Sequence, residues 1–242
     1  MCFTVNVNIV REELEKRFNT TFIDPDNYRP SYYYHAYSLP DLPVAAYFDG
    51  QFNIRLLRWG LIPSWTAGAE EAQKIRYMTF NARAETLATK PAYSDAFAAR
   101  RCIIPVKGFF EWQHKGGAKT PWYIYSADSG LMSLAGLYDR WRDPETDNSV
   151  YTFTVITSEA NKLMSEIHNT KKRMPLILQD DQEDKWLKPG AGEDDLAEIL
   201  KAYPDDRLKA HTVSPMLGDT KINRNRPELI KPYTYPRQST LF

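Results

Sequence analysis

The chain has 242 residues, of which 43% are hydrophobic and 26% are charged, and its 31 basic side chains equal its 31 acidic ones in number. This balance excludes a disordered protein, and the length suits one large domain rather than several. No apolar run approaches the roughly 18 residues that span a bilayer, and the N-terminus turns charged too soon for a secretory signal, so we expect neither a membrane protein nor an exported one.

The periodicity of apolar residues predicts several short helices. We expect them over residues 8–18, 92–99, 158–167 and 194–203. Asp180 and Glu183 have the spacing of a capping box, which predicts a further helix that ends at Leu187.

β-Branched and aromatic runs predict strands through the middle of the chain. A hairpin is expected from residues 44–48 and 53–59, with Asp49-Gly50 as its turn. Further strands are expected over Arg101–Val106 and over residues 108–113, 122–126, 131–138, 151–157 and 210–214. Residues 24–43 are expected to be irregular and the polar tail after Asn223 extended. These elements predict the α+β class with a mostly antiparallel, barrel-like sheet.

The zero formal net charge hides an uneven distribution of charge. Basic residues are concentrated in KIRYMTFNARAE, AARRCIIPVKG and HNTKKRMP, so the protein is still able to form a basic groove. The two cysteines, Cys2 and Cys102, form no CxxC pair, and the four histidines are scattered. We therefore expect no disulfide framework, no structural zinc site and no metal or organic cofactor.

Cys2 becomes an N-terminal cysteine if Met1 is removed. Its α-amine, with a pKa of ~7.7–8.0, and its thiol, with a pKa of ~8.5, would then lie on adjacent carbon atoms. An aldehyde condenses with such an amine to an imine, and the thiolate closes a five-membered thiazolidine. The alternative is that Cys2 has no role beyond following Met1.

Asn81, Glu111 and His168 are polar residues in apolar or basic surroundings. An asparagine can orient an amine or a sugar hydroxyl, and a carboxylate within FFEW would be partly desolvated, which suits it to proton transfer. Histidine is the side chain best suited to acid–base chemistry near pH 7. The structural alternatives are a strand-end carboxylate paired with an arginine and a histidine that ends a helix.

Four arginines lie near aromatic residues such as Trp59 and Trp65 in the sequence. Arginine binds phosphate groups, and aromatic rings stack on unpaired bases, so these residues predict a surface for single-stranded nucleic acid. The alternative is that the tryptophans belong to the core and the arginines to ion pairs at its rim. The arginines are Arg58, Arg76, Arg83 and Arg173.

Five motifs, taken in order, resemble those of the SRAP family, the SOS response-associated peptidases. They are MC at the start, RWGLIPSW, FNARAET, RRCIIPVKGFFEW and H…RMPLIL. The resemblance covers residue 1 to about residue 218. It implies one α+β pseudo-barrel domain, which we place at residues 1–222, followed by the tail 223–242.

The resemblance also implies a function and a site. Members of the family shield abasic sites in single-stranded DNA, and Cys2 matches the cysteine that forms a thiazolidine with the sugar aldehyde after Met1 is removed by self-processing. Asn81 matches an asparagine that contacts this cysteine and the sugar, Glu111 the active-site glutamate, and His168 a proton-shuttling histidine. DNA-binding positions are matched by Arg76, Arg83 and Trp65, and we add Arg58 and Arg173.

Two features depart from the family pattern. Many members begin MCGR, whereas this chain begins MCFT, so Phe3 and Thr4 replace a glycine and a phosphate-binding arginine. The family histidine often lies two residues before RMP, whereas NTKK separates His168 from Arg173 here. His168 is still the assignment, because it ends the preceding predicted helix.

The leading hypothesis is therefore a DNA-repair protein of the SOS and DNA-damage response that crosslinks to abasic single-stranded DNA. An imine at an abasic site also invites β-elimination, so a lyase activity is a further expectation. The alternatives are a cysteine peptidase that acts in trans and a non-catalytic single-strand-binding module. Cys102 lies in an apolar strand and is expected in the core, which disfavours the peptidase. We expect a monomer in the cytoplasm, associated with the nucleoid when bound to DNA.

Overall fold

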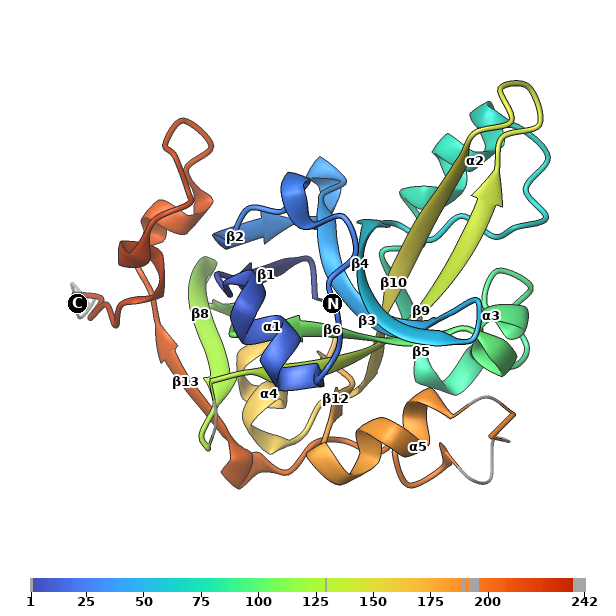
Figure 1. The fold of residues 1–242 in the computed structure, drawn as a ribbon. Coiled ribbons are helices and arrows are strands. Elements are labelled where there is room, and N and C mark those ends of the chain that lie inside the picture. Colours follow the sequence, from blue (N-terminus) through green and yellow to red (C-terminus); the bar gives the residue numbers. More distant parts are fainter. Residues whose placement is uncertain (1, 129, 189, 192–195, 237–242) are drawn as a thin grey trace.

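Two β-sheets make up most of the fold in the computed structural model, which describes residues 2–128, 130–188, 190–191 and 196–236 (Figure 1). The first sheet has the order β13-β8-β7-β1-β2, and all of its pairings are antiparallel. Its strands are β1 (Thr4–Val7), β2 (Ser31–His35), β7 (Gly108–Lys115), β8 (Ala118–Ser126) and β13 (Leu208–Thr212).

The second sheet closes on itself. β10 pairs with β4, β4 with β3, β3 with β6, β6 with β9, and β9 again with β10. Among the strands of the described residues, only β4 and β5 run parallel to β10. The strands are β3 (Asp41–Phe48), β4 (Gln51–Trp59), β5 (Asn81–Arg83), β6 (Arg101–Val106), β9 (Met132–Arg142), β10 (Ser149–Glu159), β11 (Arg173–Pro175) and β12 (Ile177–Leu178). The predicted α+β class with a mostly antiparallel, barrel-like sheet is confirmed.

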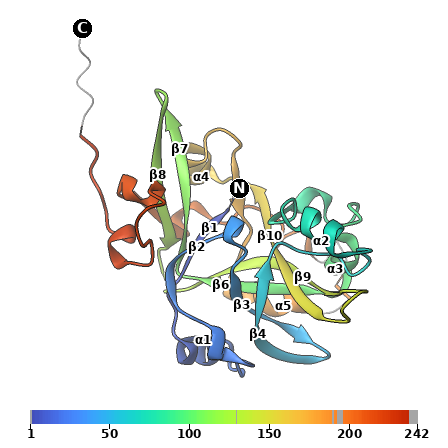
Figure 2. The ribbon, with the colours of Figure 1, turned by 90° about the horizontal axis from the view of Figure 1, so that it is seen from above.

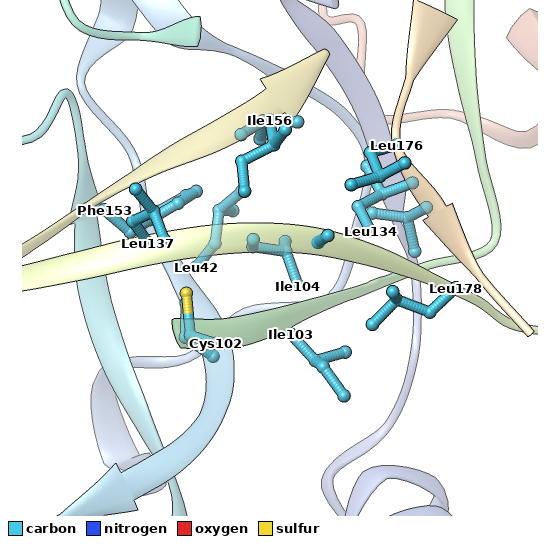
Figure 3. Packing of buried hydrophobic residues seen from close by; sticks show 14 of the residues in the cluster. Leu42, Cys102, Ile103, Ile104, Leu134, Leu137, Phe153, Ile156, Leu176 and Leu178 are labelled. Carbon is cyan, nitrogen blue, oxygen red and sulfur yellow. The ribbon is translucent and has the colours of Figure 1, made fainter. Parts of the chain in front are cut away.

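The interior of this closed sheet is the main core (Figure 3). Successive side chains of a strand face opposite sides, so one set fills the barrel and the other faces outward. β6 is buried on both sides because a helix covers its outer face, where Trp186 Nε1 donates a hydrogen bond of 3.0 Å to the Cys102 carbonyl oxygen. Cys102 itself is fully buried among these apolar side chains, as predicted.

Short helices lie around the sheets (Figures 1 and 2). The described α-helices with defined ends are α1 (Arg11–Phe18), α2 (Ala69–Arg76), α3 (Ser94–Ala99), α4 (Lys162–Ile167) and α5 (Glu183–Leu187). Figure 2 shows α4 beside the projecting β7–β8 hairpin, and Gln113 Nε2 in β7 donates a hydrogen bond of 2.9 Å to the Glu166 carbonyl oxygen in α4. No helix in the described parts of the chain is both long and apolar enough to span a bilayer.

Most predicted elements are present, with shifted ends. The hairpin and its Asp49-Gly50 turn are confirmed, and the first helix begins at Arg11, not at residue 8. The predicted capping box of Asp180 and Glu183 is wrong by one residue. Gln179 and Gln182 form the capping box, at the start of a 3₁₀ turn that leads into α5. Their amides reach backbone groups, whereas the carboxylate of Glu183 is bound by Arg17.

Two predicted stretches differ more strongly. The irregular segment 24–43 contains β2 and the start of β3, since pairing with β1 and β4 stabilises these residues despite their prolines. The helix predicted from residue 158 begins only at Lys162, because β10 continues to Glu159 and pairs there with β11. The helix predicted over 194–203 lies partly outside the described residues, and residues 197–200 form a turn. The tail contains a 3₁₀ turn at Pro227–Ile230.

Candidate functional site

A cavity of about 440 Å³ lies where β7 meets the end of α4. Two residues predicted as catalytic, Glu111 and His168, belong to its lining. The full lining is Phe3, Glu111, Trp112, His114, Lys119, His168, Thr170 and Lys171. The cavity therefore combines an acid–base pair with aromatic and cationic side chains.

Cys2 precedes β1 and is fully buried next to this cavity wall, directly before Phe3. The Thr4 backbone N–H donates a hydrogen bond to its sulfur. Burial, and then the negative charge of Glu111, raise the pKa of the Cys2 thiol to about 12. The thiol is therefore protonated near neutral pH, and it lies close enough to Glu111 to respond to its charge.

Glu111 owes its position to the pairing of β7 with the N-terminal strand. Val5 lies opposite Phe109, so the antiparallel register brings the chain before β1 toward Glu111. Glu111 and Phe109 are two residues apart and share one face of β7, which is buried at both positions. Glu111 is 5% exposed, in agreement with the desolvated environment predicted from the FFEW sequence.

His168 is the C-terminal cap residue of α4 and is also buried. Its Nδ1 lies 2.7 Å from the Arg173 carbonyl oxygen and 3.3 Å from the Arg173 backbone nitrogen. At the longer distance the Arg173 backbone N–H would donate to a bare Nδ1, whereas the carbonyl oxygen only accepts and so requires a proton on Nδ1. We assign the proton to Nδ1 because the contact with the carbonyl oxygen is the shorter one. The basic nitrogen of the neutral ring is then Nε2, as a proton shuttle needs.

The longer gap between His168 and Arg173 folds as a tight turn. Lys172 has a φ of 49°, and its backbone N–H donates a 2.9 Å hydrogen bond to the His168 carbonyl oxygen. Asn169 fastens the turn to β7, since its amide accepts from the His114 backbone nitrogen at 3.1 Å and donates to the His114 carbonyl oxygen at 2.7 Å. The inserted residues thus leave His168 beside Arg173 and facing the same cavity as Glu111.

Asn81 begins β5, where it pairs with Val155 of β10. Both polar atoms of its amide are buried and have no hydrogen-bond partner among the described residues. Such atoms are rare in folded proteins because they lose water without compensation, so they indicate a place for a ligand. Asn81 does not line the cavity, but the preceding Phe80 contacts Phe3 of the cavity wall with ring centroids 6.3 Å apart.

Gly60 of the RWGLIPSW motif allows the end of α2 to lie close to the chain that follows β4. Its φ is 107°, and a Cβ atom there would lie 2.7 Å from the Arg76 carbonyl oxygen. Only glycine fits this backbone conformation and contact, so the end of α2 packs against the chain after β4. The residues that lead from α2 into β5 are positioned by this contact.

The predicted DNA-binding residues fall into two groups. Arg83 is exposed and Arg76 half-buried, and neither forms an ion pair with a described residue. The Arg76 Nε is buried without a hydrogen-bond partner. Trp65 is half-exposed, with its Nε1 3.3 Å from the Pro91 carbonyl oxygen, whereas Trp59 is fully buried. Arg76 and Arg83 are therefore available to an anionic ligand, and the Trp65 ring is accessible from solvent.

The other two arginines already have carboxylate partners. Arg58 makes two 2.8 Å hydrogen bonds to Asp41, and Arg173 binds Glu85, with 3.0 Å between Nη2 and Oε2. Arg173 also donates to the Thr157 carbonyl oxygen and has a mostly buried side chain. Both match the ion-pair alternative considered for them, so their role in binding DNA stays a prediction.

The cavity has a basic wall that the sequence predictions did not include. It consists of His114, Lys119 and Lys171. Lys171 belongs to the basic segment HNTKKRMP, which could have identified it. Lys119 is placed there by the β7–β8 pairing, in which it lies opposite His114, and nothing in its own neighbourhood of the sequence indicates this.

The fold agrees with comparisons to known proteins. A family model described as SOS response associated peptidase (SRAP) matches residues 1–220. The chain belongs to the SRAP family. The match confirms, for this SRAP protein, the family resemblance predicted from its five motifs.

Similar proteins have related names. The chain is 38% identical over 225 residues to abasic site processing protein YoqW of Bacillus subtilis (strain 168), covering 91% of this chain and 94% of that protein. It is 34% identical over 226 residues to abasic site processing protein HMCES of Xenopus tropicalis, covering 83% and 66%. A crystal structure of a protein from Bacteroides thetaiotaomicron has a TM-score of 0.90 at 34% identity, covering 96% of this chain and all of that one.

Proposed function

We propose that this SRAP protein processes abasic sites by binding single-stranded DNA and forming a thiazolidine between Cys2 and the sugar aldehyde. The observation that carries the proposal is the position of buried Cys2, close to Glu111 and directly before Phe3, since Glu111 and Phe3 line a cavity that also contains His168 and a basic wall. The names of the similar proteins support the choice of the abasic site as substrate.

The chemistry needs no oxidant or reductant. After hydrolysis of the bond between Met1 and Cys2, the amine attacks the aldehyde carbon, and loss of water gives an imine. The sulfur then bonds to the imine carbon while the thiol proton passes to the nitrogen. Because the thiol is protonated in its buried environment, a base must take this proton, and Glu111 is the acidic side chain whose charge acts on the thiol.

We assign the opening of the sugar ring to His168. Abasic sugars are mostly closed hemiacetals, so a proton must move between the anomeric hydroxyl and the ring oxygen before the aldehyde is available. Nε2 of a neutral imidazole with its proton on Nδ1 suits this transfer. We assign to the buried amide of Asn81 a hydrogen bond with the sugar or with the Cys2 amine, which would satisfy its polar atoms.

We assign binding of the DNA backbone to cationic side chains that have no carboxylate partner among the described residues. Arg76 and Arg83 would bind phosphates, with Lys119 and Lys171 at the cavity, and exposed Trp65 would stack on a base. Arg58 and Arg173 would contribute only if DNA displaced Asp41 and Glu85. We extend the proposal to self-processing at Met1, β-elimination at the imine, a domain at residues 1–222, and a monomer acting in the cytoplasm and on the nucleoid.

A peptidase acting in trans is the weaker alternative. Cys102 is the other cysteine of the chain, and burial raises the pKa of its thiol well above the usual value. It is packed inside the closed sheet, and burial alone raises its pKa, so no described charged group acts on it as Glu111 acts on Cys2. Cys102 therefore lacks a base that would form a thiolate for attack on a peptide.

The test compares crosslinking with binding. Cys2→Ala should give no heat-stable adduct with an abasic oligonucleotide on a denaturing gel, because only the aminothiol closes the ring. Its affinity for an oligonucleotide with a tetrahydrofuran abasic analogue, which has no aldehyde, should stay within about twofold of wild type. Arg83→Glu is the matched control and should weaken this binding instead. An undiminished adduct with Cys2→Ala would contradict the thiazolidine.

A further inference from the structure

A row of rings leads away from the cavity and has no part in the chemistry above. Tyr33 and His35 lie on the same face of β2, with ring centroids 6.1 Å apart and planes at 24°. His35 contacts Tyr37 at 5.6 Å, and Tyr37 contacts Phe3 at 5.6 Å and Phe80 at 5.0 Å. We call Tyr33, His35, Tyr37, Phe3 and Phe80 the aromatic track.

The track begins at the candidate site. Phe3 follows Cys2 directly and lines the cavity that contains Glu111 and His168. At the same end, Phe80 is buried, so it supports the Tyr37 ring and does not itself offer a face to a base. Phe80 precedes Asn81, whose buried amide has no partner among the described residues. Tyr37, in the middle, is 55% exposed, although burial of a tyrosine ring is strongly favourable. A strand leaving the cavity in this direction would meet the half-exposed ring of Tyr37, whose centroid lies 5.6 Å from that of Phe3.

Arg224 closes the other end of the track. Its guanidinium carbon lies 4.2 Å from the centre of the Tyr33 ring, and its Nη1 donates a 2.7 Å hydrogen bond to the Tyr33 hydroxyl. The neighbouring Asn225 accepts a 3.0 Å hydrogen bond from the Tyr32 backbone nitrogen, which fastens the C-terminal segment along β2. Arg224 forms no ion pair with any residue in the described part of the chain.

The chemistry of the track fits unpaired bases and their phosphates. Every base has a face that stacks on an aromatic ring, and a guanidinium that lies over a tyrosine ring keeps donors for phosphate oxygens. Burial, and then the charge of Arg224, lower the pKa of His35, so the imidazole is neutral near pH 7 and stacks as an uncharged ring. Arg224 lies at the end of the row of rings, so the track offers stacking along its length and a positive charge at its end.

We propose that the aromatic track and Arg224 bind the nucleotides on one side of the abasic nucleotide, with a base on Tyr37 and a phosphate on Arg224. This inference rests on the proposed function, because it needs a single strand whose abasic sugar occupies the cavity. It assigns DNA binding to the segment after residue 220, where the match to the family model ends. Thr4 of β1 lies beside the same track, because its hydroxyl oxygen is 2.9 Å from His35 Nδ1.

The experiment uses two fluorescent oligonucleotides with a tetrahydrofuran abasic analogue, one extended only on the 5′ side and one only on the 3′ side. Fluorescence anisotropy should show that Tyr37→Ala weakens binding of one of them about 10-fold and leaves the other unchanged. Arg224→Ala should weaken the same oligonucleotide and reduce the slope of log affinity against log salt by about 0.7. Tyr37→Phe, which keeps the ring, should bind like wild type.

Two matched controls address surface changes in general. Tyr47→Ala removes another exposed tyrosine, on β3, and Arg226→Ala removes another exposed arginine of the same C-terminal segment. Both should bind like wild type. Because Arg224→Ala also releases Tyr33, Arg224→Glu is measured as well and should bind the affected oligonucleotide more weakly than Arg224→Ala at equal thermal stability.

Failure of the inference is distinguishable from failure of the proposed function. If Tyr37→Ala and Arg224→Ala match wild type on both oligonucleotides, or weaken both equally, the track does not bind one side of the strand. Wild type would then still crosslink an abasic oligonucleotide through Cys2. If wild type itself forms no adduct and does not bind the analogue, the proposed function fails, and the inference fails with it.

Discussion

At the scale of single residues, the site combines a protonated thiol with two buried groups to which we assign proton transfer. Cys2 responds to the charge of Glu111, and His168 is held in one tautomer by the Arg173 carbonyl oxygen. Neither Glu111 nor His168 is placed by a neighbour in sequence, since β7 and α4 bring them to the cavity from separate parts of the chain.

Substitution of either proton-transfer group should slow the reaction without preventing DNA binding. Removal of a general acid or base costs roughly 10²–10⁴ in rate. We expect Glu111→Gln to slow ring closure, and His168→Ala to slow adduct formation on closed abasic sugars more than on an oligonucleotide with an open-chain aldehyde. The measurement is a time course of adduct formation, followed by release into excess competitor. If both variants match wild type in both directions, neither group is catalytic.

At the scale of elements, the junction between β7 and α4 decides where His168 lies. Gln113 binds the end of α4, and Asn169 binds the backbone of His114 on both its N–H and its carbonyl oxygen. These three contacts align the end of a six-residue helix with the C-terminal end of β7. Asn169 is therefore a positioning residue for His168.

Asn169→Ala should slow crosslinking about 10-fold, because two hydrogen bonds that hold the turn are lost. The rate of the double variant Asn169→Ala/His168→Ala should equal that of His168→Ala alone, since the amide acts through the imidazole. Asn27→Ala, at an exposed asparagine remote from β7 in sequence, is the control. Multiplicative loss in the double variant would show that Asn169 acts independently of His168.

At the scale of the whole molecule, buried acids that stay protonated make stability depend on pH. Burial raises the pKa of the Cys2 thiol from 9.0 to about 12, that of Cys102 well above 9.0, and that of Tyr93 from 10.0 to about 12. Above pH 9 the unfolded chain loses these protons while the folded chain keeps them. The free energy of unfolding therefore falls as the pH rises from 9 toward 12.

Urea unfolding at pH 7, 9 and 10 should show this loss, at about 1.4 kcal/mol per buried thiol by pH 10. Cys102→Ala should be less stable than wild type at pH 7, because it leaves a cavity in the barrel, but should lose less further stability at pH 10. A stability that rises between pH 7 and 10, or an equal loss in the variant, would contradict the assignment to buried thiols.

The sequence by itself determined the α+β class, the central hairpin, the core position of Cys102 and the family, because these follow from local periodicity, turn residues and motif order. Only the tertiary structure decided which residues meet. Strand pairing brings Lys119 opposite His114, and ion pairs engage Arg58 and Arg173, while the C-terminal segment brings Arg224 onto Tyr33. The short strands β2 and β5 likewise depend on their partners, since pairing with a neighbouring strand outweighs the weak preference of a few residues.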